Sequence, residues 1–220
     1  YTGTVEFTST DPQAALPASF TFTGADAGVR VVAGQLVLKT VGTHTVTARD
    51  RASPGISGAQ TGIVVQPAAA ATLVVSGAET PRIAGDRGGV LVEVLDAFGN
   101  RATDYRGTVR FTSTDPRAEL PADHAFTGAD AGAFTFDGLV FITAGTHVLT
   151  ATDLATPALA GAQAGIEVLP GPASSLALSG IASPRVAGVP AQVTVRALDA
   201  YGNRATGYLG TVAFESSDPA

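Results

Sequence analysis

Apolar and polar residues alternate along most of this chain, and a period of two predicts half-buried β-strands. Within Gly3–Thr8, Val5 and Phe7 share one face while the polar residues between them share the other. Similar patterns predict further strands in the first third of the chain, at residues 29–38, 43–48 and 62–65. No stretch has the apolar period of a helix of three turns.

The middle of the chain carries a fuller set of such strands. Alternation and turn residues place them at 72–76, 90–95, 107–113, 124–127, 133–142, 146–151 and 164–168. This number of short strands in about a hundred residues is typical of a β-sandwich. From Ala173 the first three strands begin again. Asp-Pro pairs, which start at Asp11, Asp115 and Asp218, are expected to end the third strand of each copy, because proline donates no hydrogen bond to a sheet.

The strands recur because the sequence itself recurs. Leu95–Thr103 reads Leu-Asp-Ala-Phe-Gly-Asn-Arg-Ala-Thr, and it returns 103 residues later as Leu198–Thr206, with Tyr in place of Phe. Such a period predicts one domain for each copy. We expect a partial repeat at 1–67 with strands three to seven, a complete repeat at 68–170, and a partial repeat at 171–220 with strands one to three. Pro67 and Pro170 lie in the connectors, where proline resists bending.

Composition narrows the classes of function. The 220 residues include no Cys, Met or Trp, so no disulfide, thiol nucleophile or thiolate metal site is available. The net charge of −6 is spread thinly and the 13 basic residues form no stripe, so nucleic acid is not an expected partner. No apolar run is long enough for insertion into a membrane. No nucleophile elbow, phosphate loop or zinc motif occurs, so we expect neither an enzyme nor a cofactor.

Two segments resemble part of an immunoglobulin-like domain. Gly42–Val46 and Gly145–Leu149 occupy the place of its tyrosine corner, with His in place of Tyr and an aliphatic residue in place of the second core cysteine. A valine-rich strand leads into Asp96–Asn100, and another strand follows Gly107. Taken together, these features resemble the bacterial immunoglobulin-like repeats of large surface proteins, of the invasin and intimin kind.

This resemblance implies an all-β fold of tandem seven-stranded immunoglobulin-like β-sandwiches, located at the bacterial cell surface or outside the cell. Repeats of this kind usually serve as stalks and spacers of adhesins and extracellular fibres, and their pattern carries no catalytic residues. The partners it implies are neighbouring copies or further repeats of the same protein, arranged head to tail. Three hypotheses stay open: a stalk or filament shaft, a module that binds a glycan or a host-surface protein, and an accessory domain of a secreted hydrolase.

The repeated loop is the candidate site of each copy. Its aspartate and asparagine supply side-chain oxygens close together, as a calcium loop does, but calcium takes six to eight oxygens and this loop offers too few. We therefore interpret the loop as a turn, in which Gly and Asn take left-handed conformations and Asp binds nearby backbone N–H groups. The candidate residues are Asp96, Gly99 and Asn100, with their counterparts Asp199, Gly202 and Asn203.

Aromatic and imidazole side chains complete the candidates. Phe98 and Tyr201, at the centre of the loop, are expected to cap the sandwich or to touch the neighbouring domain, because one aromatic per repeat is a poor platform for carbohydrate. His44 and His147 have no second ligand at metal spacing. We expect each of them at the rim of the core, bonded to a loop carbonyl. His124 has no histidine counterpart and is expected to be exposed.

The alternation also predicts the core, and the partial copies pose a question. Expected core residues are Val5, Phe7, Val92, Val94, Val109, Phe111, Val195 and Phe214. A copy that lacks strands leaves sheet edges unpaired. Either the chain is a window onto a longer array, or strands one and two of one molecule complete strands three to seven of another. Both arrangements produce a filament, and the third strand that the outer copies share favours the window.

Overall fold

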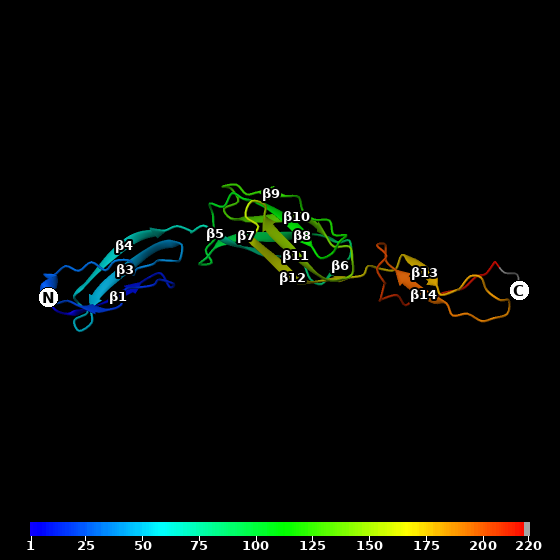
Figure 1. Ribbon diagram of the computed structural model, residues 1–220, viewed down its shortest axis with the longest axis horizontal. Coiled ribbons are helices and arrows are strands. Elements are labelled where there is room, and N and C mark those ends of the chain that lie inside the picture. The colour runs from blue at the N-terminus through cyan, green and yellow to red at the C-terminus, as the bar shows by residue number, and fades with distance from the viewer. Residues whose placement is uncertain (218–220) are drawn as a thin grey trace. The chain divides into compact units, whose positions relative to one another are not determined.

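The computed structural model describes residues 1–217, which form strands, turns and one short 3-10 helix (Figure 1). The predicted all-β class is confirmed. Within this range no helix has the length and apolar character needed to cross a membrane. The Asp218-Pro219 pair, expected to end a strand, lies outside the described residues.

The chain forms two compact units. The first comprises residues 1–72, 94–106 and 127–133, and the second comprises the remaining described residues. The first unit therefore holds the first partial copy together with the Asp96–Asn100 loop of the complete copy. The second unit holds most of the complete copy together with the last partial copy. The repeat boundaries after residues 67 and 170 stay a prediction.

Residues 1–67 form one antiparallel sheet with the strand order β2-β1-β3-β4. Its strands are β1 (Thr4–Ser9), β2 (Phe20–Thr21), β3 (Gly42–Asp50) and β4 (Ser57–Val65). Figure 1 shows β1, β3 and β4 side by side. The Gly24–Asp26 turn is a 3-10 helix, in which the Asp26 carboxylate accepts hydrogen bonds from the backbone and the hydroxyl of Thr23.

The prediction of a strand at 29–38 is wrong. This segment makes a single bridge, between Val37 and Ala15, and Val29 and Val31 are 74% and 85% exposed. In the complete copy the matching strand pairs with a neighbour that residues 1–67 do not contain. Period-two apolar sequence alone does not make a strand, because the backbone N–H and C=O groups need a partner strand.

The complete copy is a sandwich of two sheets. One has the order β10-β7-β5 and the other the order β6-β12-β11-β8-β9. The first contains β10 (Ala133–Val140), β7 (Arg87–Asp96) and β5 (Ala70–Ser76). The second contains β6 (Arg82–Ile83), β12 (Ala160–Leu169), β11 (Gly145–Asp153), β8 (Thr108–Ser113) and β9 (His124–Ala125). Every strand predicted between 72 and 168 is present. The two-residue β6, which pairs in parallel with the end of β12, was not predicted.

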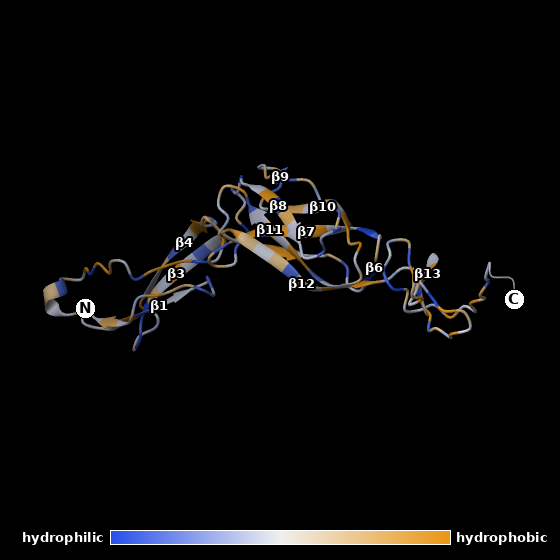
Figure 2. Ribbon diagram, turned by 45° about the vertical axis from the view of Figure 1, so that its right-hand side comes forward, coloured by the Kyte–Doolittle hydropathy of each residue, from blue (hydrophilic) through white to orange (hydrophobic). Residues whose placement is uncertain are grey.

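The core lies between these sheets. Phe111 of β8 meets Phe136 of β10 edge to face, with ring centroids 4.8 Å apart. Figure 2 shows apolar residues along β7, β8 and β10. The predicted core positions Val92, Val94 and Val109 are fully buried, and Phe111 is nearly so.

The partial copies bury less of the predicted core. Val5 and Phe7 in the first copy, and Val195 in the last, are only half-buried. Phe214 is 61% exposed, which corrects its assignment to the core. Within residues 171–217 only β13 (Ser175–Ser179) and β14 (Thr194–Leu198) form, as an antiparallel pair. The expected third strand is missing from this range, because β9 and β11, which pair with it in the complete copy, have no counterpart there.

His124 also differs from expectation, because it is half-buried. Its ring stacks on Phe134, with centroids 3.7 Å apart and planes 13° apart. The same two positions of the first copy hold Phe20 and Arg30, and the Arg30 guanidinium lies 4.7 Å from the Phe20 ring centroid. In the complete copy, an imidazole ring stacks on a phenyl ring at these two positions, and in the first copy a guanidinium lies over a phenyl ring.

Candidate functional site

The repeated loop begins where β7 ends. The Asp96 carboxylate accepts hydrogen bonds from the backbone N–H groups of Phe98 and Asn100, at 2.9 and 2.8 Å, and so closes the turn. Gly99 has a φ of +85°, and its counterpart Gly202 has a φ of +84°, as predicted. The prediction that asparagine is left-handed is wrong: among non-glycine residues of the range 1–217, only Ala27 and Ala131 have positive φ.

The asparagine side chain instead joins two distant segments. In the first unit, Asn100 Nδ2 donates to the Lys39 carbonyl at 2.7 Å, and Asn100 Oδ1 accepts from the Val41 N–H at 3.0 Å. Its second amide hydrogen goes to Asp96 Oδ2 at 2.9 Å. Both donors and one lone pair of the amide are therefore used. We call Asp96, Asn100 and the segment 39–41 the first joint.

The second unit repeats this arrangement. Asn203 Nδ2 donates to the Ile142 carbonyl at 2.8 Å, and Asn203 Oδ1 accepts from the Ala144 N–H at 2.9 Å. Asp199 accepts from the side chain and the backbone of Asn203, at 2.9 and 2.8 Å. Asp199, Asn203 and the segment 142–144 form the second joint. Each distance to the bound segment agrees with its counterpart in the first joint within about 0.1 Å, less than the normal spread of such bonds.

The aspartate of each joint also holds the connector. Asp96 Oδ2 accepts from the N–H of Ala68 at 3.0 Å, and Asp199 Oδ2 accepts from the N–H of Gly171 at 2.9 Å. These are the residues that follow Pro67 and Pro170, both half-buried just after the ends of β4 and β12. The carboxylate thus fixes the chain where it leaves one sheet and approaches the next strand.

Other side chains hold the tripeptide that asparagine binds. In the second joint, Asp115 Oδ2 accepts from the N–H groups of Ile142 and Thr143, at 2.8 and 2.9 Å. His147 Nε2 is 2.7 Å from the Thr143 carbonyl, as predicted for a histidine at the rim of the core. Together with the bonds to Asn203, every polar main-chain atom from Ile142 N to Ala144 N has a side-chain partner.

The first joint has the same support. Asp11 Oδ2 accepts from the N–H groups of Lys39 and Thr40, at 2.6 and 3.1 Å. His44 Nε2 is 2.7 Å from the Thr40 carbonyl. An aspartate, a histidine and an asparagine therefore converge on one tripeptide in each joint. Buried polar groups without partners are costly, so this satisfaction favours one local geometry.

Hydrogen bonding sets the protonation of the joint aspartates. Burial raises the pKa of Asp96, but the bonds from the Asn100 side chain and from the N–H groups of Ala68, Asn100 and Phe98 outweigh burial and lower the pKa to about 2. In Asp199 burial is likewise outweighed by the matching bonds, and the pKa is lowered. The pKa of Asp115 is lowered too, because the N–H groups of Thr143, Arg117 and Ile142 outweigh its burial. These aspartates are ionised acceptors at neutral pH.

The same bonds argue against a cation at the loop. Each carboxylate oxygen of Asp96 accepts two hydrogen bonds, which occupies the lone pairs that a calcium ion would need. Within residues 1–217 no three His, Asp or Glu side chains gather as metal ligands would. The turn interpretation therefore suits the geometry better than the calcium interpretation.

The aromatic residue of each loop is partly exposed, Phe98 by 39% and Tyr201 by 37%. The Phe98 carbonyl accepts from Gln13 Nε2 at 3.5 Å, and Lys39 Nζ lies 6.0 Å from the Phe98 ring centroid. The Tyr201 carbonyl accepts from Arg117 Nη1 at 2.7 Å. Its ring lies against Gly85, where a Cβ would overlap it. Both aromatics thus lie beside the segment that precedes their own copy.

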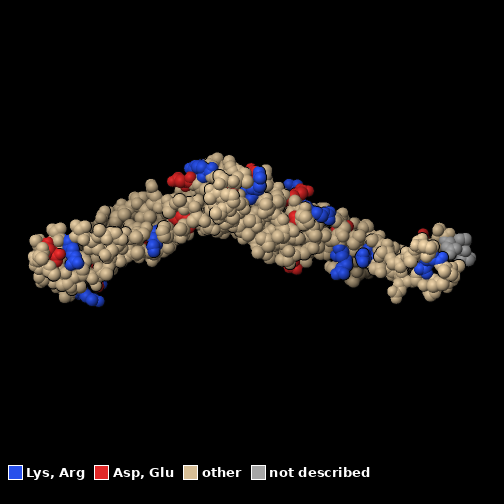
Figure 3. Space-filling model, viewed as in Figure 1, with Lys and Arg blue, Asp and Glu red and all other residues tan. Residues whose placement is uncertain are grey.

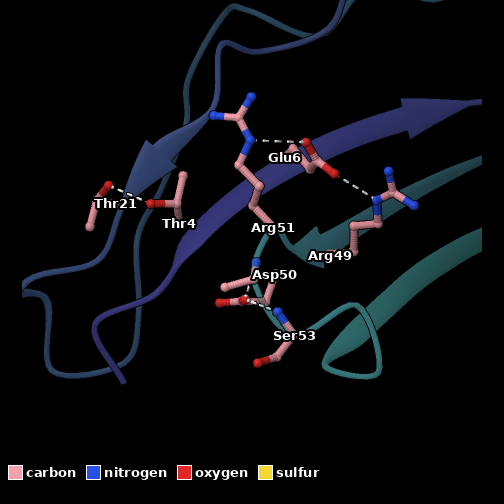
Figure 4. Close-up of polar contacts among 8 residues, drawn as sticks. Thr4, Glu6, Thr21, Arg49, Asp50, Arg51 and Ser53 are labelled. Atoms are coloured by element: carbon pink, nitrogen blue, oxygen red, sulfur yellow. Dashed lines mark hydrogen bonds and ion pairs between the residues drawn. The ribbon is translucent and has the colours of Figure 1, made fainter.

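Charged groups elsewhere form pairs on the surface. Figure 4 shows Glu6 between Arg49 and Arg51, at 2.8 and 3.9 Å, and the Asp50 carboxylate accepting from the backbone N–H of Ser53 at 2.6 Å. Figure 3 shows charges scattered singly or in pairs over a mostly uncharged face. Such exposed pairs contribute little to stability.

Sequence reasoning found the loop residues but missed their partners. The sequence predicts Asp11 and Asp115 only as strand ends. It predicts His44 and His147 at the rim of the core and bonded to a loop carbonyl, but it does not connect that carbonyl with the asparagine. A signal was available, because all of them recur at the offset of the loop, 103 or 104 residues. Residues that recur together at the period of a repeat are candidates for one shared contact.

Comparisons with known proteins give likeness in structure alone. No family model matches the chain, and no curated protein matches its sequence. Among solved structures, it is similar to the Escherichia coli adhesin FdeC, at 21% identity and a TM-score of 0.42, over 79% of this chain and 55% of that one. It is similar to invasin, described as a bacterial integrin-binding protein, at 18% identity and a TM-score of 0.38, over 94% of this chain and 41% of that one.

A third structure is InvD of Yersinia pseudotuberculosis, at 18% identity and a TM-score of 0.36, over 93% of this chain and 62% of that one. The sequence resembles surface repeats of the invasin and intimin kind, and invasin is also among the solved structures that are similar to the chain. The chain spans less than two thirds of the length of each of these three structures.

Proposed function

We propose that this chain is a structural segment of a bacterial surface or extracellular protein, built from immunoglobulin-like repeats at 1–67, 68–170 and 171–220. Its role is to hold successive repeats in a defined arrangement rather than to catalyse a reaction. The partners of each repeat are the neighbouring repeats of the same protein. The surface location rests on the resemblance of the sequence to bacterial surface repeats.

One observation carries the proposal: the same asparagine-centred joint occurs twice, and each time its aspartate also binds the residue after a proline at which a repeat boundary is predicted. Asn100 links its loop to the segment 39–41, and Asn203 links its loop to the segment 142–144. A binding or catalytic module has no need for the same polar contact at each boundary. A structural spacer does need it, because a flexible connector would let the repeats rotate freely.

Single-molecule energy transfer tests this role. The chain has no cysteine, so cysteines introduced at the exposed positions Ala59 and Ala191 accept one dye each. We expect a narrow distance distribution for the parent chain and a broader one for Asn100→Ala/Asn203→Ala. Gln60→Ala, which removes an exposed amide outside both joints, serves as the matched control and leaves the distribution narrow. Equal widths for the parent chain and the double variant would contradict the proposal.

A further inference from the structure

The tripeptides that the two asparagines bind differ in sequence. One is Lys39-Thr40-Val41 and the other is Ile142-Thr143-Ala144, so only the central threonine is shared. The bonds are nevertheless alike: 2.7 and 3.0 Å in the first joint, 2.8 and 2.9 Å in the second. The outer side chains differ in charge, size and branching, so they do not set this geometry.

Within the tripeptide, the asparagine amide bonds only to main-chain atoms. It donates to the carbonyl of one residue and accepts from the N–H two residues later, at Ile142 and Ala144. A residue in a parallel β-ladder bonds its neighbour strand in this way. The side-chain amide therefore takes the place of a peptide group, and any tripeptide held in the same conformation offers the same surface.

What holds the tripeptide in that conformation is constant between the joints. An aspartate binds its first two N–H groups, Asp11 in one joint and Asp115 in the other. A histidine binds the central carbonyl, His44 or His147. The loop that approaches is constant as well, apart from Phe98 in place of Tyr201.

We infer that each repeat carries a docking surface, formed by the main chain of residues 39–41 or 142–144, whose partner is the Asp-Ala-aromatic-Gly-Asn loop of another copy of the repeat. Recognition is by backbone, so the outer side chains of the tripeptide do not select the partner. Selection lies in the asparagine: an aspartate at that position would turn an oxygen toward the carbonyl it must bind. This inference rests on the proposed function, because it assigns the partner of the same joint.

Exchange of one tripeptide for the other tests the inference in the whole 220-residue chain. Lys39→Ile/Val41→Ala gives the first joint the residues of the second. Among the described residues, the only contact with the loop that it removes is that of the Lys39 ammonium, 6.0 Å from the Phe98 ring centroid. The readout is hydrogen exchange of the backbone N–H at position 41, corrected for intrinsic rate, with the N–H of Ala144 in the same molecule as the internal reference. We expect protection at position 41 to stay within about threefold of the parent, and Asn100→Ala to lower it about tenfold, as loss of one hydrogen bond does.

The outcomes separate the two claims. If Lys39→Ile/Val41→Ala lowers protection as much as Asn100→Ala does, recognition depends on side chains and the inference is overturned, while the proposed function stands. If Asn100→Ala leaves the protection at position 41 unchanged, the asparagine does not link the two segments, and both the inference and the proposed function are overturned. Asn100→Asp supplies a second variant of nearly unchanged volume. An aspartate oxygen can still accept from the Val41 N–H but cannot donate to the Lys39 carbonyl, so its readout is the free energy of unfolding, and a value equal to that of the parent would also overturn the inference.

Discussion

Gly161 of β12 lies directly against the carbonyl of Leu73 in β5, so closely that a Cβ at this position would overlap the carbonyl oxygen. The counterpart of Gly161 in the first copy is Gly58, where a Cβ would meet nothing within 4 Å. Main-chain atoms on both sides of the contact leave little freedom to move apart. The two glycines are thus the same residue of the repeat in two different environments.

Gly161→Ala should therefore destabilise the chain by about 1–3 kcal/mol, the usual cost of overpacking. Gly58→Ala is the matched control, and it should be neutral or stabilising by up to about 1 kcal/mol, since alanine restricts the unfolded chain. Urea denaturation followed by circular dichroism measures both. Similar costs for the two substitutions would show that glycine is needed for another reason.

The joint aspartates predict a pH dependence. The pKa of Asp96 is about 2 in the folded chain, against an ordinary value of 3.8 that applies to the unfolded chain, so the unfolded chain binds the proton more readily. Stability from this group is therefore complete above the unfolded pKa, and it is lost as the pH falls from about 4 to about 2. An NMR titration of the Asp96 carboxyl carbon should give a midpoint near the lower value. A midpoint close to 3.8 would mean that the loop hydrogen bonds do not form in solution.

The burial of Arg82 predicts the order of stability of two variants, Arg82→Ala and Arg82→Met. The residue is only 5% exposed, and its guanidinium lies beside the Phe141 ring. Nη2 donates to the carbonyls of Asp86 and Leu139, but Nε and Nη1 have no partner. Burial lowers the pKa of this arginine. Arg82→Ala should cost about 2–4 kcal/mol, because it leaves a cavity and removes a hydrogen bond from each of two carbonyls. Arg82→Met should cost less, because methionine fills the space without a buried charge.

Thermal unfolding of the two Arg82 variants checks this order. Arg185, the exposed counterpart in the last copy, provides the control, and Arg185→Met should change stability by less than about 0.5 kcal/mol. An Arg82→Met variant less stable than Arg82→Ala would mean that the methionine side chain does not fit the space that the arginine leaves.

A substitution at Gly85 tests whether the Tyr201 ring packs against this residue. Gly85 and Gly188 both have positive φ, +91° and +78°, so alanine strains the backbone at either position. Only at Gly85 would the Cβ meet a neighbour, the Tyr201 ring. Gly85→Ala should cost about 1 kcal/mol more than Gly188→Ala, because the ring must move. In a Tyr201→Ala background this difference should vanish, and if it persists, the ring is not its cause.

The strands of the complete copy could be predicted because each one has its partner within reach. Val92, Val94, Val109 and Phe111 alternate with polar residues, and both faces of that pattern are realised in the sandwich. The segment 29–38 is equally rich in apolar residues, yet most of it stays exposed. Its fate depends on whether a partner strand is present, and that information does not lie in the segment itself.

The candidate loop could be predicted only in part. Glycine at 99 and 202 follows from turn chemistry, and so do the bonds that Asp96 accepts. The role of Asn100 could not be read locally, because its partners Lys39 and Val41 are about sixty residues away and contribute main-chain atoms, which every residue has. When a side chain binds main-chain atoms, the sequence reveals only the residue that contributes the side chain, here Asn100.

The spacing of the joint has a consequence for how such a gene changes length. Asn100 and the tripeptide 142–144 lie in one copy, and the loop that binds this tripeptide lies 103 residues beyond Asn100. A duplication or deletion of one whole period, as unequal recombination between similar repeats produces, leaves each tripeptide facing an intact loop. The number of repeats can then change without any new contact between neighbouring repeats having to evolve.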